Sequence, residues 1–135
     1  MRVYVDSSAL AKRALDEAES DLVELALEGF AHAGFPVYSS TLAWVEVSRT
    51  VRNRLDAEPS ADVAELVDDA LSGVLECPIT DQVIGIARRL GPTTLRSLDA
   101  IHLASATLLD ADVVVAYDKR LLQAASEFGF RTLSP

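Results

Sequence analysis

Four short runs rich in apolar residues alternate with segments of helical spacing, and this alternation constrains the fold more than any other feature. Strands are predicted at residues 2–5, 37–39, 74–77 and 113–116, with a short edge strand at 130–133. The run at 113–116 is wholly apolar, which is typical of a strand buried on both faces. Strands separated by helices predict an α/β fold, a three-layer α/β/α sandwich around a mostly parallel sheet.

The segments between the strands have the apolar periodicity of helices, and glycine and proline interrupt them. Pro59 is expected to open one of these helices, a position where proline is favoured. The predicted helices span residues 7–14, 17–33, 41–55, 59–71, 81–90, 97–109 and 119–128. Two apolar stripes are expected to face the core: Trp44, Val47, Val51 and Leu55 in one helix, and Leu98, Ile101, Ala104 and Leu108 in another.

The composition is that of a packed protein in a reducing compartment. Its 135 residues, of which 50% are hydrophobic, fit one domain over residues 1–135 with a sizeable core. The single cysteine, Cys77, excludes an intrachain disulfide and a cysteine-rich zinc site. Asp6 interrupts the first apolar run, so no signal peptide is expected, and no run approaches the roughly 20 residues that span a bilayer. A cytoplasmic protein without a membrane partner is expected.

The net charge of −9 argues against nucleic-acid binding by bulk attraction. The acids are concentrated at residues 16–28 and 56–69, where helical spacing predicts solvated outer faces. Between these segments lies a basic run, Arg49, Arg52 and Arg54. Net charge therefore does not decide the class of partner.

Four acids are expected near one edge of the sheet. Asp6 and Asp118 follow the first and fourth strands, and open α/β sheets carry their sites beyond the carboxyl ends of strands. Asp99 opens the helix that leads into the fourth strand, and Glu46 lies between two valines in the helix after the second. Each residue also has an ordinary interpretation. Asp6 and Asp118 suit helix caps, Asp99 suits a first turn capped by Ser97, Glu46 could face water, and His102 could be a hydrogen-bonded helix residue.

Taken together, the four acids predict a metal site. Carboxylates that close to one another cannot all stay ionised without a cation between them. Oxygen ligands favour a hard divalent ion, Mg²⁺ or Mn²⁺, over zinc. Such an ion can activate water and stabilise the leaving oxygen of a phosphodiester displacement.

Four segments resemble PIN-domain proteins, in particular the VapC-type toxins of bacterial and archaeal toxin–antitoxin pairs. They are VDSSALAK at 5–12, TLAWVEVSR at 41–49, RSLDAIHLASA at 96–106 and VVVAYDKRLLQAA at 113–125. The LDAIHLA segment, with its spacing to YDKRL, is the most specific part. The resemblance covers essentially the whole chain.

The resemblance implies a Mg²⁺- or Mn²⁺-dependent endoribonuclease, the toxin of a type II toxin–antitoxin system, which cleaves RNA phosphodiesters with a metal-activated water. It also implies a homodimer that a cognate antitoxin inhibits. Asp6 and Asp99 would be the principal metal ligands, and Glu46 and Asp118 would bind through water or complete a second ion's shell. Ser8 and Arg96 fall on supporting positions of the family. The candidates for binding the RNA backbone are Lys12, Arg13, Arg49, Arg52 and Arg96.

One departure from the family pattern keeps a second function open. Ala116 stands where the family often has threonine, two residues before the last acid. The alternative is a catalytically weak or inactive PIN-like module that binds RNA or a protein partner. A phosphoacceptor receiver domain is set aside, because Ser7 follows Asp6 where an acidic pair is needed, and Cys77 and Pro78 end the third strand where an acceptor aspartate is needed.

Overall fold

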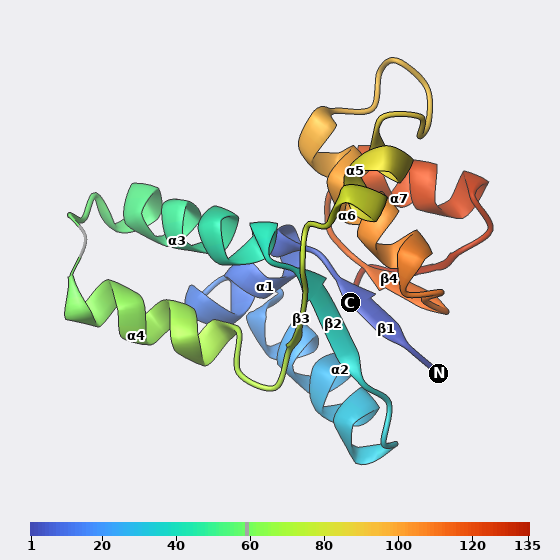
Figure 1. The fold of residues 1–135 in the computed structure, drawn as a ribbon. Helices are drawn as coiled ribbons and strands as arrows, with labels where there is room; N and C mark the ends of the chain where they lie inside the picture. Colours follow the sequence, from blue (N-terminus) through green and yellow to red (C-terminus); the bar gives the residue numbers. More distant parts are fainter. Residues whose placement is uncertain (59) are drawn as a thin grey trace.

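A computed structural model of the chain describes residues 1–58 and 60–135 (Figure 1). Strands and helices follow one another in the predicted order. The elements are β1 (Val3–Val5), α1 (Ser7–Ala14), α2 (Ser20–His32), β2 (Val37–Ser40), α3 (Leu42–Leu55), α4 (Ala61–Ala70), β3 (Leu75–Cys77), α5 (Asp81–Ala87), α6 (Ser97–Leu108), β4 (Val113–Val115), α7 (Lys119–Glu127) and β5 (Arg131–Leu133). The expected helix start at Pro59 lies outside the described residues. No described helix combines the length and apolarity needed to cross a membrane.

The strands form one sheet in the order β3-β2-β1-β4-β5, and every neighbouring pair is parallel. Val3 of β1 lies opposite Val37 of β2 on one side and Val113 of β4 on the other. All three residues of β4 are buried, and β5 lies at the sheet edge, so both predictions about these strands are confirmed. A parallel sheet brings the carboxyl ends of its strands to one edge.

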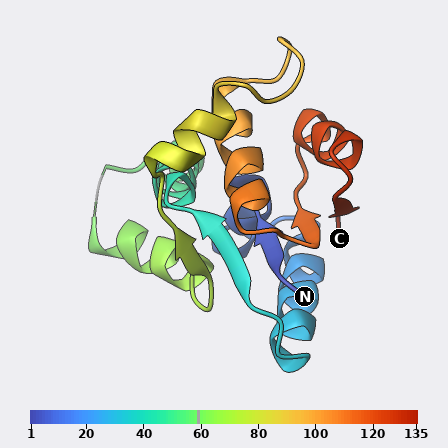
Figure 2. The same ribbon diagram turned by 45° about the vertical axis from the view of Figure 1, so that its right-hand side comes forward.

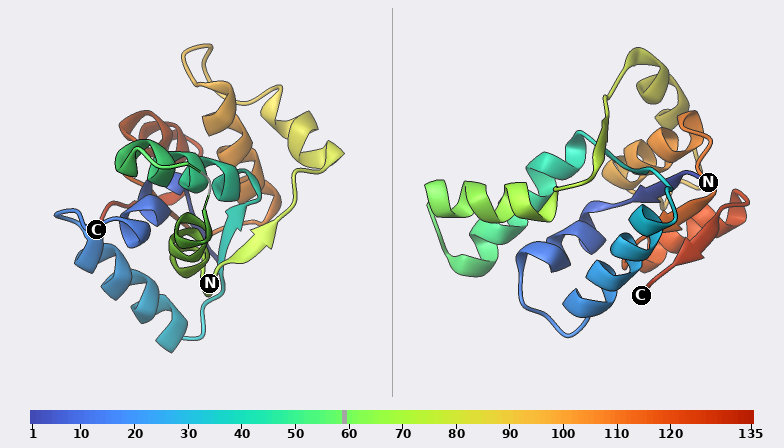
Figure 3. Two further views of the ribbon diagram at one scale, coloured as in Figure 1. Left: turned by 90° about the vertical axis from the view of Figure 1, so that its left-hand side faces the viewer. Right: turned by 90° about the horizontal axis from the view of Figure 1, so that it is seen from below.

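Successive side chains of β1 enter two different core layers, as strand geometry requires. Val3 and Val5 belong to a first core cluster with residues of α1, α2, α3 and α4. Tyr4, between them, belongs to a second cluster with residues of α6 and α7. Helices therefore cover both faces of the sheet, and the predicted three-layer sandwich is confirmed (Figure 2). The α3–α4 pair packs on α1 and projects from the body of the molecule (Figure 3).

Two helices differ from their predicted bounds by three residues at one end, because local hydrogen bonds form turns there. α2 begins at Ser20 rather than Glu17, since the Ser20 hydroxyl donates to the Leu15 carbonyl and accepts from the Glu17 N–H. α5 ends at Ala87 rather than at residue 90. The amides of residues 89 and 90 donate to carbonyls three residues back, which tightens the chain into a turn.

The predicted apolar face of α6 is confirmed at Ala104, which is fully buried, and in part at Ile101, which is half-buried, but it is wrong at both ends. Leu98 and Leu108 are 48% and 40% exposed, whereas Ala100 and Leu103 are buried. The helix is rotated so that its small residues approach the sheet, and the larger leucines near its ends reach solvent. The stripe of α3 is confirmed in its middle, where Val47 and Val51 are buried and Trp44 packs against the first core cluster. It fails at Leu55, which is 50% exposed at the end of the projecting helix.

The first core cluster predicts a large difference between two leucines on neighbouring helices. Leu10 of α1 is fully buried, whereas Leu25 of α2 is 67% exposed. Leu10→Ala is expected to lower the free energy of unfolding by about 2–5 kcal/mol, through lost burial and the cavity left behind. Leu25→Ala should change it by no more than about 0.5 kcal/mol. Urea denaturation followed by circular dichroism measures both, and equal effects would contradict the core described above.

Candidate active site

The carboxyl edge of the sheet carries a pocket lined by all four predicted acids. Asp6 and Asp118 reach it from the ends of β1 and β4, Asp99 from the first turn of α6, and Glu46 from α3. Three of the residues named as supporting or RNA-binding also line it: Ser8, Lys12 and Arg96. Segments separated by up to 112 positions in the chain thus meet in one place.

Asp6 is the most deeply buried of these acids, with 3% of the residue exposed. It caps α1, because its Oδ1 accepts from the Ala9 N–H at 3.2 Å, and the Ser8 hydroxyl donates to the same oxygen at 2.6 Å. Burial raises the pKa of Asp6 to about 6, against the opposing influence of His102 and these hydrogen bonds. Ser8 also accepts from the Tyr117 N–H at 2.9 Å, and so ties the start of α1 to the loop that carries Asp118.

Asp99 has no partner for one of its oxygens. Its Oδ2 is buried and has no hydrogen bond within residues 1–58 and 60–135. Burial raises the pKa of Asp99, and the nearby charges of Asp118 and Glu46 raise it further against the opposing influence of His102 and Arg96. A buried, unpartnered carboxylate oxygen is costly in a folded protein, and it is also an open ligand position.

Asp118 and Glu46 each use one oxygen in a hydrogen bond to the protein. Asp118 caps α7, because its Oδ1 accepts from the N–H groups of residues 120 and 121. Glu46 Oε1 lies 2.5 Å from His102 Nε2, and the Glu46 side chain is 24% exposed. The expectation that Glu46 simply faces water is therefore wrong, because α6 supplies a buried partner for it.

Of the ordinary interpretations of the other four residues, three are confirmed and one is wrong. Asp6 and Asp118 are helix caps as predicted, in addition to lining the pocket. His102 is a hydrogen-bonded residue of α6, also as predicted. Ser97 is not the cap of that helix, because it occupies the first helical position and Arg96 stands in the cap position without a side-chain hydrogen bond.

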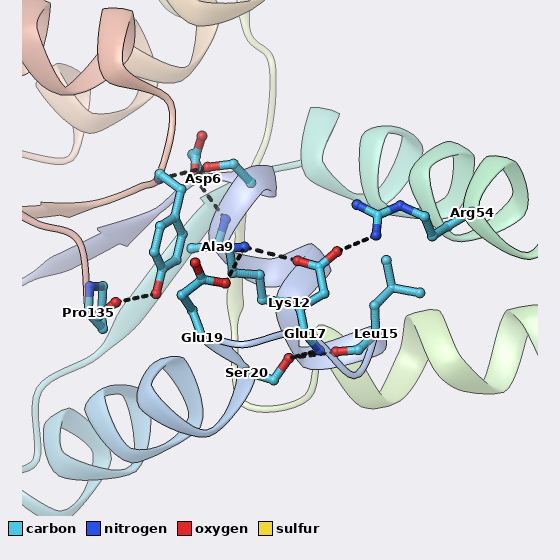
Figure 4. Close-up of polar contacts among 11 residues, drawn as sticks. Asp6, Ala9, Lys12, Leu15, Glu17, Glu19, Ser20, Arg54 and Pro135 are labelled. Atoms are coloured by element: carbon cyan, nitrogen blue, oxygen red, sulfur yellow. Dashed lines mark hydrogen bonds and ion pairs between the residues drawn. The ribbon is translucent and has the colours of Figure 1, made fainter.

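A group of charged side chains forms one wall of the pocket (Figure 4). The Lys12 ammonium contacts Glu17 at 2.9 Å and Glu19 at 3.0 Å, and lies 4.6 Å from the centre of the Tyr117 ring. Glu17 also accepts from Arg54 at 2.8 Å. Sequence reasoning noted Arg54 in the basic run but did not assign it to the site. Nothing in the sequence pattern shows that the turn at Glu17 meets the end of α3.

Three of the predicted RNA-binding arginines do not line this pocket. Arg13 donates to the Glu24 carboxylate and to the carbonyls of residues 70 and 72, and so connects α1 with α2 and the end of α4. Arg52 has a 3.4 Å contact with the Ala57 carbonyl, and Arg49 is exposed elsewhere on α3. Arg96, in contrast, is an exposed pocket residue without an ion pair in the described part of the chain.

Ala116 does not face the pocket. It is fully buried in the second core cluster, beside residues of α6 and α7. Ala116 therefore belongs to the packing beneath the site and not to the pocket lining.

The donor set suits a hard divalent cation, since it consists of carboxylate oxygens and one of them is buried without a partner. A cation would offset the burial and repulsion that raise the pKa values of Asp6 and Asp99. As placed, no three His, Cys, Asp or Glu side chains in the described ranges are spaced to hold one ion together. The pocket thus brings carboxylate side chains around an open space, with their charge only partly balanced by the basic residues of the lining.

Comparison with known proteins gives a family for this fold and site. Residues 3–127 match the PIN domain family. Ribonucleases VapC47 and VapC46 of Mycobacterium tuberculosis are each 38% identical to the chain over 135 residues. The alignments cover 98% of this chain and 96% and 97% of those two proteins. The chain therefore belongs to the PIN domain family, as a member of the VapC type.

Solved structures agree with this fold. The VapC20 toxin of Mycobacterium tuberculosis, described as cleaving the sarcin-ricin loop, superposes with a TM-score of 0.72 at 17% identity. VapBC2 of Rickettsia felis, solved with a promoter DNA fragment, superposes with a TM-score of 0.74 at 12% identity. Both matches cover 98% of this chain, and 99% and 98% of those chains. At such identities the likeness shows the fold alone.

The raised pKa of Asp6 predicts an unusual pH dependence of the metal-free protein. Folded Asp6 ionises near pH 6 and an ordinary aspartate near 3.8, so this residue lowers the stability progressively as pH rises from about 4 to 6. Asp6→Asn keeps the helix cap and removes this effect. Above pH 6 the free energy of unfolding of Asp6→Asn is expected to exceed that of the wild type by up to about 3 kcal/mol.

Urea denaturation in EDTA at pH 4 and pH 7 measures this difference. Asp21→Asn is the matched control, since Asp21 is an exposed acid in the first turn of α2. If Asp6→Asn is no more stable than the wild type at pH 7, the burial cost assigned to the Asp6 carboxylate is contradicted.

Proposed function

We propose that this chain is an endoribonuclease, the toxin of a type II toxin–antitoxin system, and that it requires Mg²⁺ or Mn²⁺. The proposal draws on the VapC ribonucleases at 38% identity over nearly the whole chain, and on the acidic pocket at the sheet edge. We propose further that residues 1–135 act as one cytoplasmic domain that forms a homodimer, and that a cognate antitoxin inhibits it. The Rickettsia felis VapBC2 structure, which shares this fold, supports an antitoxin partner.

The observation that carries the metal requirement is the unpartnered Oδ2 of Asp99. Folded proteins rarely leave a buried carboxylate oxygen without a donor. Here the surrounding side chains include Asp118 and Glu46, whose charges oppose the ionised form of Asp99. A divalent cation is the partner that satisfies this oxygen and the neighbouring acids at once.

The chain's own residues have distinct roles in this proposal. Asp6 and Asp99 would be the principal ligands, and Glu46 and Asp118 would complete the site, directly or through water. Ser8 fixes the orientation of Asp6 by donating to its Oδ1, which leaves Oδ2 for the ion. A bound cation would activate water and stabilise the negative charge that develops on the phosphate.

The rim residues would place the RNA. Arg96 is exposed beside Asp99, and its planar guanidinium suits a phosphate. Lys12 is already paired with Glu17 and Glu19, so its ammonium is not a free phosphate ligand. Its charge instead contributes to the electrostatic potential of the pocket wall. The cation and Arg96 together would offset the repulsion between RNA and a chain of net charge −9.

Loss of the central ligand tests the proposal most directly. Asp99→Asn keeps the shape of the side chain and removes its charge, so cleavage of a structured RNA pool with Mn²⁺ is expected to fall at least about a hundredfold. EDTA should abolish cleavage by the wild type. Asp62→Asn, which alters an exposed first-turn acid of α4, should cleave like the wild type. Full activity of purified Asp99→Asn would show that the catalytic assignment is wrong.

Arg96 gives a second test, which concerns RNA binding alone. In an Asp99→Asn background that cannot cleave, Arg96→Ala is expected to weaken binding and to lower the slope of log affinity against log salt by about 0.7, the value for one phosphate contact on a single strand. Arg131→Ala is the control, because Arg131 begins β5 and so lies at the amino ends of the strands, away from the pocket at their carboxyl ends. Fluorescence anisotropy with labelled RNA at several salt concentrations measures the slopes, and equal slopes would remove Arg96 from the RNA-binding surface.

A non-cleaving module that binds RNA or a protein remains the second candidate. It is favoured by the spacing of the acids, since the described residues contain no three-ligand group ready to hold an ion. RNA binding that is equal in Mn²⁺ and in EDTA, without turnover of any RNA in the pool, would support this function and contradict the nuclease.

A further inference from the structure

His102 is a buried residue that lies behind the pocket and has no assigned role in the proposed metal site. It lies on α6 one turn beyond Asp99, is 2% exposed, and does not line the pocket. Both of its ring nitrogens nevertheless have close partners. Nδ1 lies 2.7 Å from the hydroxyl of Tyr4, and Nε2 lies 2.5 Å from Oε1 of Glu46.

These contacts form one chain through the centre of the molecule. The Ser40 N–H at the end of β2 donates to the Tyr4 hydroxyl at 3.1 Å. Tyr4 belongs to β1, His102 to α6 and Glu46 to α3, so this series of hydrogen bonds joins the sheet to helices on both of its faces. Tyr4 is fully buried, and burial raises the pKa of its hydroxyl, which therefore keeps its proton.

The donors and acceptors in this chain have one consistent direction. The Tyr4 oxygen accepts from the Ser40 amide, so its own proton is available for His102 Nδ1. A neutral imidazole with this partner carries its proton on Nε2 and donates it to Glu46 Oε1, and an imidazolium donates to Glu46 from the same nitrogen. A backbone amide in the sheet thus orients a phenol, the phenol orients an imidazole, and the imidazole orients a carboxylate.

We propose that Tyr4 and His102 are positioning residues that hold Glu46 in the orientation in which it serves the metal site. This inference rests on the metal requirement proposed above. Glutamate has a long side chain with considerable rotamer freedom, and Glu46 is partly exposed on α3. Fixing Oε1 on a buried imidazole restricts that freedom and leaves Oε2 for the ion. Hydrogen-bond partners that orient a metal ligand are a recurring requirement of metal sites.

The proposal predicts changes in metal affinity that a purely structural histidine would not cause. His102→Leu removes the donor to Glu46, and Mn²⁺ binding by the purified protein is expected to weaken about tenfold. His102→Gln retains an amide N–H with a reach similar to that of Nε2, and should recover most of the affinity. In a Glu46→Gln background the His102→Leu substitution should cause no further loss, because His102 acts through Glu46. Isothermal titration with Mn²⁺ measures all of these variants without RNA.

Tyr4→Phe tests the same chain with a smaller disturbance of the core. It removes only the hydroxyl, and Mn²⁺ affinity is expected to fall about two- to tenfold, the net effect of one hydrogen bond. Tyr38→Phe is the matched control, because Tyr38 lies beside Tyr4 in the sheet and packs in the same cluster without a side-chain hydrogen bond among the described residues.

The outcomes separate this inference from the proposed function. If folded His102→Leu binds Mn²⁺ with wild-type affinity, the positioning role is overturned and the metal site stays in place. If His102→Leu does not fold, wild-type affinity of Tyr4→Phe has the same meaning. An equal loss for His102→Leu in the Glu46→Gln background would also overturn it. Failure of the wild type to bind Mn²⁺ would overturn the metal requirement and this inference with it.

Discussion

Repulsion and desolvation among the carboxylates at the sheet edge are the constraint on which the rest of this structure depends. Parallel strands bring Asp6 and Asp118 to the same edge, and α6 adds Asp99 beside them. Burial raises the pKa of Asp6 and Asp99, so their ionised forms lower the stability of the folded state. The rest of the structure must offset this cost. A stable scaffold that holds destabilising groups together is the usual condition of a functional site.

The fold limits this cost because most of the acids also accept hydrogen bonds from the protein. Asp6 and Asp118 use Oδ1 to cap α1 and α7, where backbone N–H groups and the helix dipole favour a negative charge. Glu46 accepts from a buried imidazole. Asp99 is the exception, because its Oδ2 has no partner among the residues that the structure describes. The same hydrogen bonds that lower the cost also fix the directions of the side chains, so the geometry of the site follows from that of the helix starts.

Much of the architecture could be predicted from the sequence, because hydrophobic periodicity and helix-breaking residues are local signals. The order of elements and the edge position of β5 are confirmed. The errors occurred where packing overrides periodicity. The face of α6 is set by how closely its alanines approach the sheet, so Leu98 and Leu108 reach solvent although the helical spacing suggested burial. The start of α2 depends on one serine hydroxyl, which a periodicity argument does not detect.

The sequence by itself determined the fold class, the likeness to PIN-domain proteins and the identity of the four acids, because these depend on residue type and spacing along the chain. Tertiary structure alone decided which of the other candidates join them. Arg13 and Lys12 are neighbours in sequence, yet Arg13 connects helices away from the pocket while Lys12 lines it, because adjacent residues of a helix point about 100° apart. The link from Tyr4 through His102 to Glu46 joins three elements that are distant in sequence, and no local pattern encodes such a contact.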